Sequence, residues 1–338
     1  MGEKILSFFD DLTLKICESL AFALQRRHRK VNARTTVEEV LDMECFHDFR
    51  QFLFPGTLGK TDLKKTLSEI APFFPYHKHV NTEVTLEVLQ FMRERAESGE
   101  RIFYDIYSEE EKNNDPTKRP TGMFFFRGIP CAPFAVVCPG GSFAYLASLH
   151  ESLPHAVRLS RRGFNAFALC YRTDSAEAAC EDLAAAITFV FDHAFELGID
   201  TECYSLWGSS VGAHIAAYVT SYGPQPFGGK KLPRAGTLVM QYTGHTNHTR
   251  QEPPTYVCVG ENDGMCDWQV MKKRCDALAA CGIDTEFHKY PHLGHGFGLG
   301  IGTEAEGWIE SAIAFWKRHL PARARRVLKR LEMRAAGA

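Results

Sequence analysis

Short apolar runs alternate with amphipathic segments between Arg101 and Leu320. The apolar runs are rich in β-branched and aromatic residues and predict strands. They cover residues 101–108, 121–128, 133–140, 165–172, 203–208, 236–244, 255–261 and 285–291. The first two runs are joined by a polar segment and predict an antiparallel pair. The later runs are almost continuously apolar, as expected for parallel strands buried on both faces.

The amphipathic segments carry apolar residues at helical spacing and predict helices. They cover residues 150–163, 176–198, 210–223, 267–282 and 303–320. Because strands and helices alternate steadily, the chain predicts an α/β fold with a mostly parallel sheet of about eight strands and helices on both faces. Ligands of such sheets bind beyond the carboxyl ends of the strands. The residues that follow each strand are therefore the first candidates for a functional site.

Residues 1–100 predict a helical extension without recognisable chemistry of its own. Threonines at 35 and 36 suit the start of one helix, and a longer helix is expected from Asn81 to Gly99. We expect this extension to pack on the main domain, residues 101–320, as a possible cap over a pocket. The basic residues 321–338 predict a solvated terminal helix, and contact with an acidic partner or a membrane surface is the alternative.

Composition and charge exclude several classes of protein. The 338 residues are 45% hydrophobic and 24% charged, with a formal net charge of -2, which argues against a nucleic-acid partner. No stretch approaches the roughly 18 apolar residues of a membrane span. Asp10 and Asp11 interrupt any signal-peptide core, and Leu6 breaks the myristoylation pattern. A cytoplasmic protein is the expectation.

The eleven cysteines are scattered along the chain without a C-x-x-C pair. Cys138, Cys170 and Cys258 lie inside apolar runs, where a thiol behaves as a small buried hydrophobe. This usage fits a reducing compartment rather than disulfides or a metal site.

A serine at a strand-to-helix junction is the first chemical signal. Gly208-Ser209-Ser210-Val211-Gly212 fits the G-x-S-x-G pattern with Ser210, not Ser209, in the middle. The two glycines permit a sharp turn that leaves Ser210 exposed, while Ser209 is a small spacer beside a possible pocket. The amide of Val211 would lie at the helix N-terminus, where it could donate to a developing oxyanion.

A serine nucleophile needs a base and an acid, and both follow later strands. Asp263 lies in the turn just past one predicted strand, with Glu261 as the second choice for the acid. His295, between two glycines in the loop after the last strand, is the preferred base, and His292 is expected nearer the surface. His245, also at a strand end, is expected at most to line a pocket.

A glycine loop follows the third predicted strand. Gly140 and Gly141 would bring unhindered amides beside the nucleophile, where a second oxyanion donor is needed. Ser142 and Phe143 continue this loop and are possible pocket residues. His150 and Glu151 follow it, and the sequence leaves open whether they cap the next helix or line the pocket.

These elements together resemble the α/β-hydrolase superfamily, and within it the esterases and acetylesterases that have a P-G-G-G-[YF] loop. The resemblance covers about residues 101–320 and includes "PGGSF", "LWGSSVG", "VGENDGM" and "HLGHGFGLG". It implies a nucleophile at Ser210, an acid at Asp263 and a general base at His295. It also implies an oxyanion hole formed by Gly140, Gly141 and the Val211 amide. Ser142 replaces the third glycine of the family loop, and its side chain could crowd the acyl pocket or bind substrate.

The expected function is hydrolysis of a small carboxylic ester, short-chain acyl or acetyl, through an acyl-enzyme and without a cofactor or metal. A peptidase or lactone hydrolase on the same scaffold is the alternative among enzymes. A hydrolase fold used as a binding module without turnover is the alternative of another class. The sequence makes no prediction of the oligomeric state.

Overall fold

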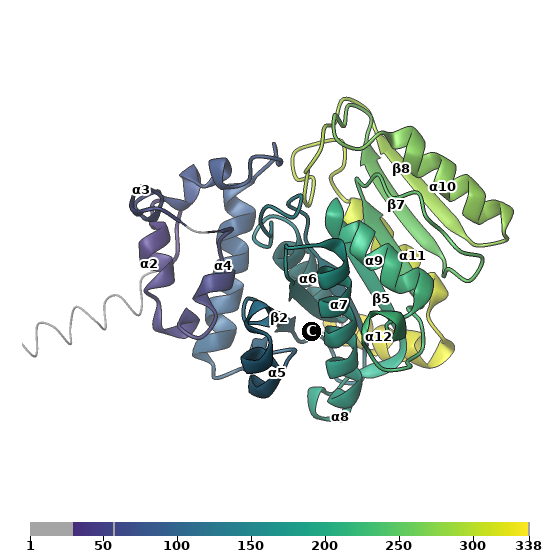
Figure 1. The fold of residues 1–338 in the computed structure, drawn as a ribbon, viewed down its shortest axis with the longest axis horizontal. Coiled ribbons are helices and arrows are strands. Elements are labelled where there is room, and N and C mark those ends of the chain that lie inside the picture. Colours follow the sequence, from purple (N-terminus) through teal and green to yellow (C-terminus); the bar gives the residue numbers. More distant parts are fainter. Residues whose placement is uncertain (1–29, 57, 337–338) are drawn as a thin grey trace, which may run out of the picture. The chain divides into compact units, whose positions relative to one another are not determined.

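The structure is a computed structural model that describes residues 30–56 and 58–336 (Figure 1). From Ala33 onward the chain forms one compact unit. The N-terminal residues considered above, Leu6, Asp10 and Asp11, lie outside the described part. Within residues 30–56 and 58–336, no helix combines the length and the apolar character needed to cross a bilayer.

Eight strands form one sheet, in the order β1-β2-β4-β3-β5-β6-β7-β8. Strand β2 is antiparallel to β1 and to β4, and all other neighbours are parallel. The strands are β1 (Phe103–Tyr104), β2 (Gly122–Phe126), β3 (Pro133–Cys138), β4 (Asn165–Cys170), β5 (Asp200–Ser209), β6 (Thr237–Gln241), β7 (Thr255–Gly260) and β8 (Thr285–Tyr290). The predicted α/β fold with a mostly parallel sheet is confirmed.

Burial along the strands follows their composition. Every residue of β2, β3, β4, β6 and β7 is buried, which explains their continuous apolar sequences. In β8, at one edge of the sheet, every residue is only half-buried, and this strand carries the mixed sequence "TEFHKY". The carboxyl ends of the central strands β3, β5 and β6 therefore lie in the buried interior of the molecule.

Helices cover both faces of the sheet (Figure 1). On one face lie α6 (Ser152–Arg161) and α11 (Trp308–His319), and on the other α7 (Ala176–Asp192) and α9 (Val211–Tyr222). Helix α10 (Trp268–Ala280) packs on β7 and β8, and the short α8 (Ala194–Leu197) follows α7. After α11 the basic tail forms α12 (Ala322–Ala336), in which Ala324 and Leu328 are buried. The start of this tail is thus packed, not wholly solvated as expected.

From Ala33 onward the N-terminal region is helical, as predicted, and belongs to the same compact unit as the sheet. It contains α2 (Val37–Leu41), α3 (Lys60–Leu63), α4 (Thr82–Glu97) and the 3-10 turns η1 (Glu44–Phe46), η2 (Arg50–Phe52), η3 (Leu67–Glu69) and η4 (Ala71–Phe73). Thr36 caps α2 and Asn81 caps α4 through their side chains. Helix α4 packs on α6, where Glu87 lies 3.0 Å from Arg158. The segment between η4 and α4 runs towards the end of the sheet that carries the candidate site.

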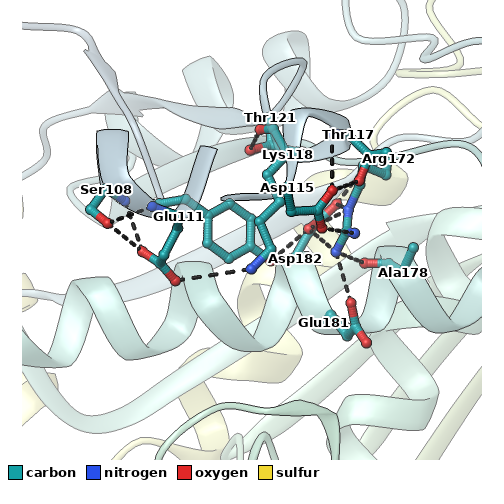
Figure 2. Close-up of polar contacts among 11 residues, drawn as sticks. Ser108, Glu111, Asp115, Thr117, Lys118, Thr121, Arg172, Ala178, Glu181 and Asp182 are labelled. Carbon is teal, nitrogen blue, oxygen red and sulfur yellow. Dashed lines mark hydrogen bonds and ion pairs between the residues drawn. The ribbon is translucent and has the colours of Figure 1, made fainter. Parts of the chain in front are cut away.

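The polar segment between the first two strands is not a simple turn. It forms α5 (Glu109–Asn114) and the 3-10 turn η5 (Pro116–Lys118), because Ser108 and Glu111 make a reciprocal capping box. Figure 2 shows this box beside a network around Arg172, whose guanidinium bonds to the buried carboxylate of Asp182 on α7. The ion pair of Arg172 with Asp115 and the hydrogen bond from Tyr107 to Asp182 join this segment to the end of β4 and to α7.

Candidate active site

Ser210 lies at the junction between β5 and α9, in a backbone conformation that few residues adopt. Its φ and ψ are 53° and -122°. A Cβ added at Gly212 would lie 2.1 Å from the carbonyl oxygen of Cys138, and one at Gly208 would lie 2.3 Å from that of Gly212. Both positions therefore require glycine, and the strained turn fixes the direction of Ser210. The serine is only 7% exposed, so it lies beneath the surrounding loops and not in the open position that the motif suggested.

The structure brings the three predicted residues Ser210, His295 and Asp263 into one hydrogen-bonded chain. His295 Nε2 lies 3.1 Å from Ser210 Oγ, and its Nδ1 lies 2.8 Å from Asp263 Oδ2. The second oxygen of Asp263 accepts the backbone amides of Met265 and Cys266, at 2.9 and 2.8 Å. The aspartate is thereby oriented by its own turn and fixes the tautomer and orientation of the imidazole.

The second choices for acid and base both lie at the surface. Glu261 is exposed and forms an ion pair with Lys289. His292 is exposed too and takes a positive φ of 60° in the turn after β8. Geometry thus favours Asp263 over Glu261 and His295 over His292.

A thiol lies next to this chain of hydrogen bonds. Asp263, Cys266 and His295 each offer an atom that could bind a metal ion, and these atoms lie within 4.8 Å of one another. They form the one group of possible metal ligands in the part of the chain that the structure describes. The facing atoms of Asp263 and His295 already bond to each other. Burial, with Asp263 nearby, raises the pKa of the Cys266 thiol to about 12, so the thiolate that metals prefer is disfavoured. The group fits a Ser-His-Asp arrangement better than a resident metal centre.

The glycine loop after β3 approaches Ser210 closely. A Cβ added at Gly140 would lie 2.8 Å from the Cβ of Ser210. The amide of Gly140, however, donates to Glu151 Oε2, so it is not directed at a substrate, and the expected role as an oxyanion donor does not fit. Val211 is the first residue of α9, so its amide is not used inside the helix. Gly141 and Val211 remain as the candidate donors.

Ser142 and Phe143 follow in the same loop with φ values of 55° and 57°. Left-handed backbone costs a non-glycine residue roughly 1–2 kcal/mol, so the loop is held in this shape by its surroundings. Both residues are half-buried, and their place in a substrate pocket stays a prediction.

Two other predicted pocket residues are buried. Ser209 is buried, and its hydroxyl donates to Gln241 Oε1 at 2.8 Å. His245 is buried as well, with its Nδ1 3.2 Å from Nδ1 of His214 and its ring against Tyr218. Burial lowers the pKa of His245 to about 3, so it is held neutral. Neither side chain has the accessible position that was expected.

Glu151 is the charged centre behind the glycine loop. It precedes α6 but makes no helix cap, and its side chain is fully buried. It accepts three hydrogen bonds: from the amide of Gly140, from His77 Nε2 at 2.8 Å and from the hydroxyl of Tyr242 at 2.7 Å. Burial alone would raise the pKa of this carboxyl, but His77 and the hydrogen bonds lower it to about 2. Glu151 is therefore an ionised anchor for the loop and neither a cap nor a pocket residue.

Sequence analysis assigned no individual role in the site to His77 or Tyr242, although residues 77–82 belong to a segment that could shape the pocket. Tyr242 directly follows β6, so the search at strand ends could have found it. His77 has no such signal, because it comes from the N-terminal region and meets Glu151 across 74 positions of sequence. His150, whose role was left open, bonds through Nε2 to the carbonyl of Gly296 at 2.8 Å and so supports the loop that carries His295.

Two cavities lie outside this hydrogen-bonded chain. The larger, about 730 Å³, is lined by charged and aromatic residues of the segment after β1, of η5 and of α7, among them Tyr107, Lys118 and Phe189. A small groove runs between His79 and Asn81 of the N-terminal region and Phe297 in the loop after β8. Ser210, His295 and Asp263 line neither cavity.

Comparison with known proteins identifies the fold. The BD-FAE family model matches residues 131–235, which include the glycine loop and the Ser210 junction. No curated protein sequence matches the chain. Among solved structures, an acetyl ester-xyloside bifunctional hydrolase from Caldicellulosiruptor lactoaceticus is similar, with a TM-score of 0.56 and 21% identity. The match covers 64% of this chain and 95% of that chain.

Two further structures are similar over a comparable share of the chain. Esterase 2 of Thermogutta terrifontis has a TM-score of 0.51 and 18% identity, covering 58% of this chain and 88% of that chain. A sugar hydrolase from Lactococcus lactis has a TM-score of 0.52 and 19% identity, covering 59% and 94%. The chain has the α/β-hydrolase fold. Each of these three matches leaves more than a third of this chain uncovered, although the neighbours themselves are covered to 88–95%.

Proposed function

We propose that this protein is a serine hydrolase that cleaves small carboxylic esters. The observation that carries the proposal is the continuous chain from Ser210 Oγ through His295 to Asp263 at the carboxyl ends of β5, β7 and β8. A hydroxyl, an imidazole and a buried carboxylate in this order are the parts needed for nucleophilic acyl transfer.

In the proposed reaction, His295 Nε2 takes the proton of Ser210 as Oγ attacks the ester carbonyl. The imidazolium is stabilised by Asp263 and then gives its proton to the leaving alcohol. The amides of Gly141 and Val211 donate to the oxyanion of each tetrahedral intermediate. Water, deprotonated by the same histidine, hydrolyses the acyl-enzyme and releases the acid. No step requires a cofactor.

The choice of an ester with a small acyl group rests on two observations. Ser210 is only 7% exposed, which favours a small acyl group over a long acyl chain. Two of the similar structures are an acetyl ester-xyloside hydrolase and an esterase. The Thermogutta esterase has also been seen phosphorylated by paraoxon, which suggests the same reagent as a probe here.

The adjacent serines provide a matched pair of variants. Ser210→Ala should lower kcat/KM for p-nitrophenyl acetate by about 10³-fold or more, since it removes the nucleophile. Ser209→Ala should stay within about tenfold of the wild type, because it removes only a hydrogen bond to Gln241. Paraoxon should add one diethylphosphoryl group, located at Ser210 by peptide mapping. Equal activity of Ser210→Ala and wild type, or a label on another residue, would overturn the assignment.

The same substrate panel tests the two alternatives. Turnover of aminoacyl amides or lactones, but not of simple esters, would assign a different acyl substrate to the same three residues. Absence of both turnover and paraoxon labelling in folded protein would contradict catalysis and indicate a binding module.

A further inference from the structure

His77 is a buried residue of the N-terminal region, on the segment between η4 and α4. It is 6% exposed, and both ring nitrogens have partners. Its Nε2 lies 2.8 Å from Glu151 Oε1, and its Nδ1 lies 2.9 Å from the hydroxyl of Tyr145. An ionised carboxylate only accepts hydrogen bonds, so Nε2 is the donor to Glu151.

Both partners of His77 belong to the loop that runs from Gly140 to Glu151. Glu151 holds the amide of Gly140, which lies against Ser210. Tyr145 holds the other side, because its amide donates to the carbonyl of Gly141 at 3.3 Å and its own carbonyl packs on Gly141. One imidazole thus binds two points of the loop that carries the candidate oxyanion donor.

The backbone of His77 also contacts the loop that carries His295. A Cβ added at Gly296 would lie 2.8 Å from the Cα of His77 and 2.8 Å from the carbonyl oxygen of Tyr76. Gly296 has a φ of 72° and follows His295 directly. His77 therefore lies between the two loops whose relative position decides whether Gly141 and His295 face the same carbonyl group.

We propose that His77 is a positioning residue for the hydrolysis reaction, which sets the geometry of the glycine loop through Glu151 and Tyr145. The N-terminal region is then a required part of the active site and not only a cover over it. The kinetic part of this inference rests on the proposed function. Misplacing a reacting group by about 1 Å can cost about 10²-fold in rate, and removing one oxyanion donor costs about 10²–10³.

Two amide variants separate the contacts of His77. In His77→Gln the side-chain nitrogen can take the place of Nε2 and donate to Glu151. In His77→Asn the shorter amide matches Nδ1 and can reach Tyr145 but not Glu151. We expect His77→Asn to lower kcat about 10- to 100-fold, with KM within about threefold of wild type. In His77→Gln, kcat should lie within about fivefold of the wild-type value. His47→Asn is the control, since this histidine of the same region is 65% exposed.

Rates are to be expressed per active site titrated with paraoxon, so that misfolded protein does not count. A second readout, independent of turnover, is hydrogen exchange of peptides that cover residues 139–151. Exchange there should be faster in His77→Asn than in wild type and near wild type in His77→Gln. If the role of His77 were purely structural, its replacement would lower the melting temperature but leave kcat per titrated site unchanged, with no difference in kcat between His77→Asn and His77→Gln. That result overturns the inference.

Tyr145→Phe keeps the test decisive if His77→Asn does not fold, because it removes only the hydroxyl beside Nδ1. It should lower kcat at least about threefold and speed exchange in residues 139–151, and unchanged values for both would contradict the proposal. If the wild type hydrolyses no ester, the proposed function fails. The exchange comparison between His77→Asn and His77→Gln still decides whether His77 positions the loop.

Discussion

The ring of Tyr242 packs edge-on against the imidazole of His295, with 4.8 Å between the ring centroids. The hydroxyl of the same tyrosine donates to Glu151 and accepts the amide of Gly298. One buried side chain therefore touches the proposed base and also bonds to the carboxylate that holds the glycine loop. Two loops far apart in sequence are joined by it.

Tyr242→Phe keeps the ring against His295 and removes one of the three donors to Glu151. A hydrogen bond to a buried charge contributes about 1.5–3 kcal/mol, so the free energy of unfolding should fall by that amount in urea denaturation at pH 7. Tyr204→Phe is the matched control, since its hydroxyl donates to the carbonyl of Pro233. If Tyr242→Phe lowered the free energy of unfolding no more than the control does, the hydrogen bond from Tyr242 would not be needed to stabilise the buried charge of Glu151.

From two buried histidines we predict how the free energy of unfolding changes with pH. Burial lowers the pKa of both His150 and His155 to about 4. Between pH 4 and about 6.5 the unfolded chain then binds protons that the folded chain does not, so the free energy of unfolding should rise as the pH rises. Glu151, with its pKa lowered to about 2, adds a loss of stability only below about pH 4.5.

His155→Phe isolates one of these groups, because a phenyl ring can keep the contact with Trp308, whose ring centroid lies 5.2 Å from that of His155. Each histidine contributes a slope of up to about 1.4 kcal/mol per pH unit. Urea unfolding at pH 5 and 6 should show a slope smaller by about that amount in the variant. An identical slope in both proteins would mean that His155 is not held neutral in the fold.

Much of the candidate site followed from local sequence. Strands buried on both faces are recognisable as apolar runs, and Ser210 and Asp263 follow such runs, whereas His295 follows the half-buried edge strand β8. The choice of Asp263 over Glu261 agrees with the geometry, because only Asp263 turns towards the imidazole and is fixed by amides of its own turn.

The rest depended on contacts between distant segments. Gly140 looked like an oxyanion donor because nothing local shows that its amide is taken by Glu151, which lies in the same loop but eleven positions later. Ser209 and His245 were possible pocket residues because they lie at strand ends, yet both are buried, with Ser209 bonded to Gln241 and His245 in contact with His214. His77 has neither a motif nor a strand before it, so only the packed structure shows its place.

Asp182 on α7 should matter for stability and not for the chemical step. Its buried carboxylate binds the guanidinium and the amide of Arg172 and accepts the hydroxyl of Tyr107 at 2.7 Å (Figure 2). Breaking a buried pair leaves an uncompensated charge, so Asp182→Asn should destabilise the protein by about 3–5 kcal/mol. Asp192→Asn, which breaks an exposed pair with Lys230, should cost under about 1 kcal/mol.

Activity per paraoxon-titrated site should stay within about threefold of wild type in Asp182→Asn, since the residue has no contact with the proposed catalytic groups. The expected result is therefore a large fall in the urea midpoint at an unchanged kcat. A fall in kcat per titrated site would show that this ion pair reaches the active site through the start of α7.

Cysteine labelling tests whether the thiol beside Asp263 takes part in the chemistry. Burial raises the pKa of Cys266 to about 12, so at pH 8 almost none of it is the reactive thiolate. Cys131 and Cys281 are exposed among the described cysteines and should react first with iodoacetamide, as followed by mass spectrometry. Ester hydrolysis should survive this labelling, because neither residue contacts Ser210, His295 or Asp263. Loss of activity in step with alkylation of Cys266, and protection by Cys266→Ala, would instead make this thiol a reactive part of the site.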